Sequence, residues 1–196
     1  MTALVGLTRL LGVVNAAMLA AGRWLGVACV ALMVLFILVQ VFFRYVLGNA
    51  LPWSEEAARF LMLWMTGLMA PTAFRRGGFV SIDLVMMMMP RVVAALVQLV
   101  LLCLSLAVLL MGMRIGWAEV TGFGGRFATD ALWVPLNLGF SEWMKVPRSW
   151  AMASLATGVT MLVAVNVELI LRSLVQLFGG GERLPVIPDS ATMGAE

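Results

Sequence analysis

Residues 24–43 read WLGVACVALMVLFILVQVFF, and this stretch of 20 residues between Arg23 and Arg44 contains no charged side chain. About 20 predominantly apolar residues in a helix are needed to cross the hydrocarbon core of a bilayer. The rest of the chain has the same character, since 63% of its 196 residues are hydrophobic and only 12% are charged. Soluble domains are about half apolar and about a quarter charged. The stretch therefore predicts a membrane span at about 24–46.

Further along the chain, two more uncharged runs are long enough to cross. The run between Arg91 and Arg114 has 22 residues, and the run between Arg148 and Glu168 has 19. Together with a shorter second segment, they predict an all-α fold, an integral membrane bundle of four transmembrane helices. The expected spans are 24–46, 54–76, 91–113 and 149–171, in a single membrane domain at 1–178 with a disordered tail at 179–196.

The second segment is too short to cross if it is limited to its uncharged part. Only 15 uncharged residues separate Arg59 from Arg75, which is about 22 Å of helix. We therefore expect this helix to begin earlier, with Ser54 as its N-cap and Glu55 and Glu56 in its first turn. These carboxylates and Arg59 then lie at the membrane boundary.

Residues 3–22 predict an N-terminal amphipathic helix or an extension of the first span. Apolar side chains recur at helical spacing opposite Thr8 and Asn15, namely Leu4, Leu7, Leu11, Val14 and Met18. Such a segment either lies at the membrane interface or continues into the first span. The pattern by itself leaves both possibilities open.

The residue types argue against an enzyme and against a metal or cofactor site. The chain has no histidine, and its two cysteines, Cys29 and Cys103, each lie in an apolar run, where packing is the simpler role. A net charge of +3 that is spread along the chain does not indicate binding to nucleic acid. We expect no catalytic residue, no substrate site and no cofactor, and contact with membrane lipid instead.

Glu55, Glu56 and Arg59 are the most informative polar cluster. Both carboxylates can reach the guanidinium across one turn of helix, and the same face continues through small residues at Thr66, Gly67 and Ala70. Small residues allow another membrane helix to approach closely. We interpret this face as a contact with a partner subunit; the alternative is an interfacial salt bridge without a partner.

Other charged side chains also lie near the predicted ends of spans. Arg44 closes the first span and either pairs with the acidic pair at 55–56 or extends to lipid headgroups. Glu168 near the end of the fourth span can pair with Arg172 four residues later. No span has a charged residue near its centre, which is unlike a solute pathway. Lys and Arg are split seven to six between the two sides, so charge does not decide the orientation.

Several short motifs lie between the first and third predicted spans. They are Arg44-Tyr45, Leu51-Pro52-Trp53-Ser54-Glu55-Glu56, Arg59, Arg75-Arg76-Gly77-Gly78 and Asp83. With four spans in this order, the chain resembles the small permease subunit of tripartite ATP-independent periplasmic (TRAP) transporters, the DctQ-like family. It departs from that family in having Phe79 where a histidine is common, and its 114–148 connection is longer than usual.

The resemblance implies a non-catalytic scaffold in the bacterial inner membrane, with both termini in the cytoplasm. The partners would be a large TRAP permease subunit, which carries the substrate and sodium sites, and a periplasmic solute-binding protein that delivers an organic acid. The subunit-interface candidates are Arg44, Trp53, Glu55, Glu56, Arg59, Gly67, Arg75, Arg76 and Asp83. The alternatives are a free-standing four-span channel, a membrane assembly protein or a membrane enzyme.

Overall fold

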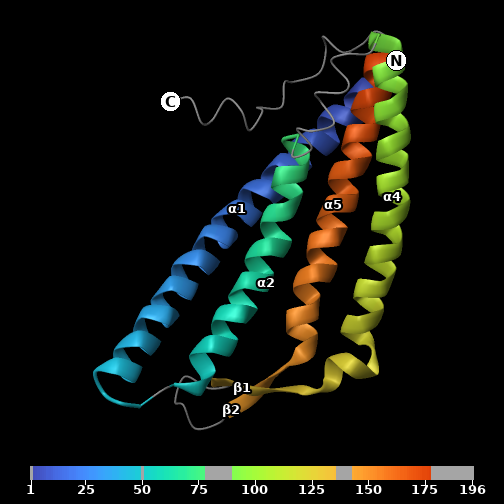
Figure 1. Ribbon diagram of the computed structural model, residues 1–196. Helices are drawn as coiled ribbons and strands as arrows, with labels where there is room; N and C mark the ends of the chain where they lie inside the picture. Colours follow the sequence, from blue (N-terminus) through green and yellow to red (C-terminus); the bar gives the residue numbers. More distant parts are fainter. Residues whose placement is uncertain (1, 50, 78–89, 136–142, 178–196) are drawn as a thin grey trace, which may run out of the picture.

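The computed structural model describes residues 2–49, 51–77, 90–135 and 143–177. Figure 1 shows that long helices dominate this part of the chain. In chain order the elements are α1 (Thr2–Tyr45), α2 (Pro52–Arg75), α4 (Arg91–Thr121), a short 3-10 helix η1 (Phe123–Arg126), β1 (Ala128–Pro135), β2 (Trp143–Pro147) and α5 (Arg148–Leu177). The helices occupy the regions in which the four spans were predicted.

Three of these helices are long and apolar enough to cross a membrane. They are α1 from Val5 to Tyr45, α4 from Val92 to Thr121, and α5. The helix α2 has 24 residues, four of them charged, and is not among the three. The described part of the chain is therefore helical and typical of a membrane protein.

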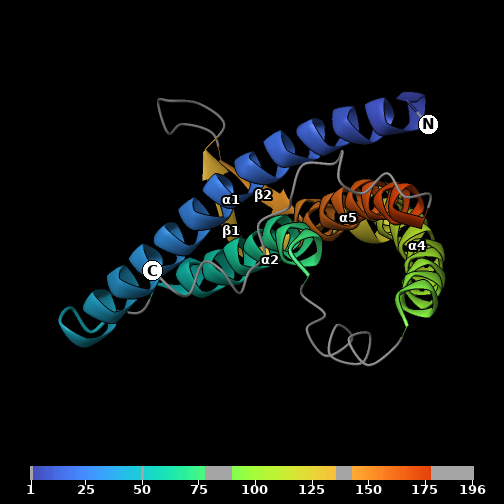
Figure 2. The ribbon, with the colours of Figure 1, turned by 90° about the horizontal axis from the view of Figure 1, so that it is seen from above.

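The four helices pack as an open row in the order α1, α2, α5, α4, which we call the helix row. Each of the three neighbouring pairs in this order packs together extensively, and α1 also meets α5. Figure 2 shows α1 and α4 at the two edges, with α2 and α5 between them. The predicted bundle is therefore open on one side rather than closed around a central axis.

One face of α1 explains how it packs onto α2 and α5. The buried positions on this face follow alternating spacings of four and three residues: Thr8, Gly12, Asn15, Leu19, Gly22 and Gly26. Such a spacing keeps one seam of a helix against its neighbours, and the three glycines let the backbones approach closely.

The side chains on this seam reverse the usual sense of an amphipathic helix. Thr8 and Asn15 are buried, whereas Leu7 and Val14 lie on the outside and are 50% and 55% exposed. The helix is continuous from Thr2 to Tyr45, so residues 3–22 run directly into the first long apolar stretch. In a lipid environment this arrangement places the polar side chains against protein.

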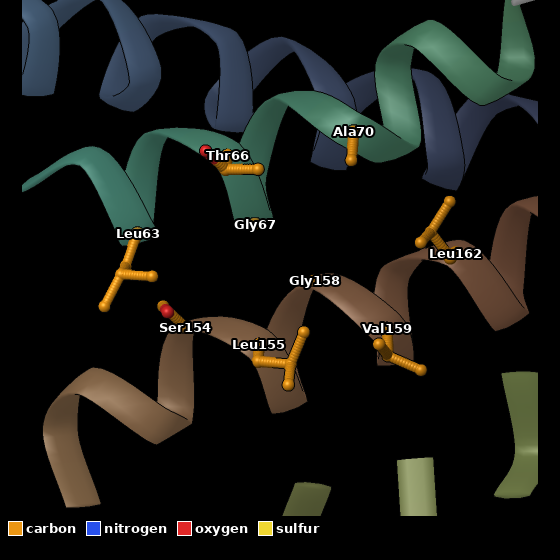
Figure 3. Close-up of a pocket in the computed structure, with 9 residues that line it drawn as sticks. All are labelled: Leu63, Thr66, Gly67, Ala70, Ser154, Leu155, Gly158, Val159 and Leu162. Carbon is orange, nitrogen blue, oxygen red and sulfur yellow. The ribbon is translucent and has the colours of Figure 1, made fainter. Parts of the chain in front are cut away.

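A close backbone approach joins Gly67 of α2 to Gly158 of α5. A Cβ atom added to Gly158 would lie 2.6 Å from the Gly67 carbonyl oxygen, and one added to Gly67 would overlap the Ser154 carbonyl oxygen. Beside this crossing lies an open groove of about 140 Å³. Figure 3 shows its walls, which are formed from α2 by Leu63, Thr66, Gly67 and Ala70 and from α5 by Ser154, Leu155, Gly158, Val159 and Leu162.

Two details of the helix ends differ from the sequence prediction. The helix α2 begins at Pro52 with Leu51 as its N-cap, and Ser54 is not the cap, since its hydroxyl donates to the Leu51 carbonyl at 2.9 Å. Proline suits the first helical position because that position needs no backbone N–H donor. The helix α4 continues to Thr121, eight residues beyond the predicted end at 113.

A β-hairpin in the 114–148 connection was not predicted. The strands β1 and β2 pair antiparallel, with Trp133 opposite Lys145. The Lys145 ammonium group lies 5.1 Å from the centre of the Trp133 ring, a favourable cation–π arrangement. On the adjoining part of α4, the Trp117 indole N–H donates to the Thr160 hydroxyl at 3.1 Å, which links α4 to α5.

We expect Gly158→Ala to destabilise the chain by about 1–3 kcal/mol, because the added methyl group overpacks a tight contact. Thermal unfolding in detergent measures this effect. Gly6→Ala is the matched control, since a Cβ at Gly6 meets no atom within 4 Å. A melting temperature of Gly158→Ala equal to that of the wild type would show that the two helices do not approach this closely.

Candidate functional site: a buried ion cluster

A buried carboxylate holds three helices together at one end of the row. The Glu168 side chain on α5 has no exposed surface, and it pairs with Arg75 and Arg172, whose side chains are 13% and 11% exposed. We call Asn15, Arg75, Glu168 and Arg172 the ion cluster. It lies at the end of α2, near the end of α5 and in the first half of α1.

Arg75 provides the strongest contact in the ion cluster. Its Nε donates to Glu168 Oε2 at 3.0 Å, and its Nη2 donates to Glu168 Oε1 at 2.7 Å. The same Nη2 also donates to the Gly12 carbonyl oxygen at 2.9 Å. A bidentate guanidinium–carboxylate pair is stronger and more directional than a single hydrogen bond, so Arg75 fixes the end of α2 against both α5 and α1.

The remaining bonds complete the shell around the Glu168 carboxylate. Arg172 Nε donates to Oε1 at 2.9 Å. Asn15 Nδ2 donates to Oε2 at 2.8 Å and to the Ala164 carbonyl oxygen at 3.1 Å. Each carboxylate oxygen therefore accepts two hydrogen bonds, which offsets much of the cost of burying the charge.

Gly12 provides the space in which the ion cluster fits under α1. A Cβ atom at this position would lie 3.1 Å from Glu168 Oε1 and 3.2 Å from Arg172 Nη2. Both distances are shorter than ordinary van der Waals contact, so a side chain here would push on the charged groups. The absence of a side chain at Gly12 therefore leaves the room that the ion pair beneath α1 needs.

The arrangement is suited to holding helices together rather than to chemistry. Two guanidinium groups and one carboxylate give the cluster a net charge of +1, and both carboxylate oxygens are already engaged. Within residues 2–49, 51–77, 90–135 and 143–177, no group of three or more His, Cys, Asp or Glu side chains is close enough together to hold a metal ion.

The acidic cluster that the sequence singled out lies at the opposite end of α2. Arg59 Nη2 and Glu55 Oε1 are 2.6 Å apart, and their side chains are 73% and 66% exposed. The predicted pairing of these two residues is confirmed. An exposed pair of this kind contributes only about 0–1 kcal/mol, so it adds little to the stability of the chain.

Two aromatic contacts accompany this end of the helices. The Trp53 ring packs edge-on against Phe36 of α1, with ring centres 5.5 Å apart. The Arg44 guanidinium lies 5.9 Å from the centre of the neighbouring Tyr45 ring. Trp53 therefore joins α2 to α1, in addition to its predicted role at a subunit interface, which stays a prediction.

The other interface candidates have different positions. Gly67 contacts α5 of the same chain, so the small-residue face predicted for a partner is partly used within the chain. Arg75 belongs to the ion cluster, and the backbone N–H of Arg76 donates to the Thr72 carbonyl oxygen at 3.2 Å. Asp83 lies outside the described residues.

The sequence predicted one pair of the ion cluster, but it did not predict that the cluster joins three helices. The pairing of Glu168 with Arg172 was predicted from their spacing and is confirmed at 2.9 Å. The pairing of Glu168 with Arg75 joins residues 93 positions apart. Both lie at the ends of even-numbered spans, which emerge on the same side of a membrane, and Asn15 lies in the segment before the first predicted span.

Comparison with known families gives one result. The family described as "Tripartite ATP-independent periplasmic transporters, DctQ component" matches residues 33–176. The matched region begins within α1 and ends within α5, and it confirms the resemblance inferred from the motifs. No individual curated protein matches the chain.

We expect Glu168→Ala to destabilise the chain by about 3–5 kcal/mol, because it leaves Arg75 and Arg172 buried without their partner. Glu55→Ala removes an exposed carboxylate and should cost about 1 kcal/mol or less. The comparison of the two melting temperatures in detergent tests the difference. Equal losses would mean that the ion cluster contributes no more than a surface salt bridge.

Proposed function

The chain belongs to the DctQ component family of tripartite ATP-independent periplasmic transporters, and we propose that it is the non-catalytic small subunit that scaffolds a large permease subunit in the bacterial inner membrane. The family match carries this proposal, because it covers the greater part of the chain. A component of a tripartite transporter acts together with other proteins, which argues against the free-standing channel or assembly protein.

The proposed subunit crosses the membrane four times, with α2 as a span beside the three more apolar helices. At 24 residues, α2 is about 36 Å long, which is enough to cross. Its charges support this role, since Glu55, Glu56 and Arg59 lie in its first eight residues and Arg75 is its last residue. Four spans place both termini on one side, which we assign to the cytoplasm.

A scaffold role is supported by the state of the buried charges. The Glu168 carboxylate accepts four hydrogen bonds from this chain, so it offers no free ligand to a sodium ion or a solute. Transport pathways place accessible ionisable or broken-helix elements inside the membrane. We therefore assign sodium coupling and the binding of an organic acid to the large subunit. A periplasmic solute-binding protein would deliver the acid.

In this orientation the start of α2 and the β-hairpin face the periplasm. The exposed Glu55–Arg59 pair and the Trp53 side chain lie at this end of α2. Indole rings are favourable both at headgroup level and in protein contacts. We propose that this end contributes the polar part of the contact with the large subunit.

The test of the proposed function is reconstitution with and without the large subunit. Liposomes that contain only this chain should show no sodium-dependent uptake of organic acids, whereas the chain should co-purify with the large permease subunit of the same transporter. Uptake by the chain alone, or a failure of the two subunits to co-purify, would contradict the proposal.

A charge reversal tests the periplasmic contact separately. Arg59→Glu should reduce the amount of large subunit retained on the tagged chain. The loss of binding free energy should exceed the approximately 1 kcal/mol that an exposed salt bridge explains. Arg126→Glu, at another exposed arginine, is the control for a change in net charge. If the two variants retain equal amounts of partner, the Glu55–Arg59 pair is an interfacial salt bridge without a partner.

A further inference from the structure

The uncharged runs of α2 and α5 both have their centres at the glycine crossing. Gly67 is the middle residue of the uncharged run between Arg59 and Arg75, and Gly158 is the middle residue of the run between Arg148 and Glu168. The two glycines touch. The crossing therefore lies at the middle of the uncharged runs of these two helices, and Arg114 of α4 can be placed relative to it.

Arg114 of α4 lies level with this crossing. A Cβ atom at Gly112 would lie 3.6 Å from Val159 Cγ1, and one at Gly116 would lie 3.3 Å from Ala156 Cα. Since Arg114 is midway between these two glycines, its backbone is level with residues 156–159 of α5. Gly158 lies ten residues after Arg148, so this level is about 15 Å from the start of α5.

Arg114 has a different position relative to the neighbouring helix than its place in the sequence predicts. Arg114 closes the uncharged run of α4, so the sequence placed it at the end of a span. The register shows that the uncharged runs of α4 and α5 are staggered, and the end of one lies beside the middle of the other. Arg114 therefore lies level with the middle of the uncharged runs of α2 and α5, although it closes the uncharged run of its own helix.

The side chain of Arg114 points away from the helix row. It is two residues from each of Gly112 and Gly116, which puts it about 200° around the helix from the face that packs on α5. Its surroundings on α4 are apolar and exposed, including Val108 at 71%, Met111 at 70% and Ile115 at 64%. These side chains and Arg114 form what we call the outer face of α4.

Arg114 makes no hydrogen bond or ion pair in the described part of the chain. The nearest acidic residue along α4, Glu119, is five positions away and lies on a different side of the helix. A guanidinium at this depth is costly in lipid, and such groups face protein or water-filled cavities and pair with opposite charges. The distance of about 15 Å to the start of α5 also exceeds the reach of an arginine side chain, so extension towards headgroups does not remove the cost.

We propose that Arg114 pairs with a carboxylate on a transmembrane helix of the large permease subunit, and that the outer face of α4 is the contact surface for that helix. This inference rests on the proposed function, because it requires the large subunit as partner. The positive charge of Arg114 requires a carboxylate as its partner, and the exposed apolar side chains around Arg114 suit contact with a membrane helix. Arg23, beside Gly22 at the same level on the other edge, is already half-buried in the chain.

The experiment uses the tagged chain co-expressed with its large subunit and purified in detergent. Arg114→Glu should lower the retained large subunit at least tenfold, and Arg114→Gln should also lower it, whereas Arg114→Lys should keep most of it. Arg126→Glu, in η1 just beyond α4, should retain as much as the wild type. Because Arg114 is exposed in the isolated chain, its variants should leave the melting temperature of the chain alone unchanged.

The possible outcomes separate this inference from the proposed function. If wild-type chain retains no large subunit, the proposed function fails. If wild type retains it and Arg114→Glu and Arg114→Gln retain as much, Arg114 is held by lipid phosphates and the proposed contact is wrong. Should Arg114→Glu fail to insert, Arg114→Gln alone decides, since it removes the charge without adding one.

Discussion

The bidentate pair between Arg75 and Glu168 is the contact on which the arrangement of the helices depends. It joins the last residue of α2 to a buried position of α5, and the same guanidinium reaches the backbone of α1 at Gly12. Because both charges are largely buried, neither can leave without stranding the other. The pair thus fixes how far the three helices are shifted along their axes relative to one another. The buried seam of α1 and the Gly67–Gly158 crossing follow from these relative positions.

Away from the ion cluster the helices are held by shape rather than by charge. The contacts of α1 use Gly22 against the Leu68 backbone and Gly26 against Met69, and α4 uses Gly116 against Ala156. In lipid the hydrophobic effect does not drive one helix onto another, so close approach and dispersion have to do so. Two hydroxyl groups on α5 are bonded within the helix, as Thr157 and Thr160 donate to carbonyl oxygens one turn earlier.

The sequence predicted what depends on neighbouring residues and missed what depends on register. Uncharged runs located the four helices, and spacing identified the Glu55–Arg59 and Glu168–Arg172 pairs. The Arg75–Glu168 pair and the position of Arg114 beside α5 depend on how two helices are placed along their axes relative to each other, which no single segment contains. The hairpin was missed because the 114–148 connection has glycines and tryptophans but no clear alternation of apolar and polar residues. The helix α2 begins at Pro52 rather than at the predicted Ser54 because the fixed backbone angle of proline suits the first turn.

An open row suits a subunit better than a closed bundle would. A closed bundle of four helices turns its small residues inward and presents mainly large apolar side chains to its surroundings. Here α2 and α5 are clamped by the ion cluster, so the row keeps its shape without closing, and α1 and α4 remain as edges. At the clamped end the side chains of Asn15, Arg75 and Arg172 donate to the Glu168 carboxylate, although the buried Asn166 amide and Ser173 hydroxyl have no hydrogen-bond partner in the described chain. Arg114 on the α4 edge makes no ion pair in the described chain. The charged side chains of the ion cluster are thus paired where the helices are joined, whereas Arg114 is unpaired at the α4 edge within the described residues, which is the asymmetry expected of one component of a larger membrane assembly.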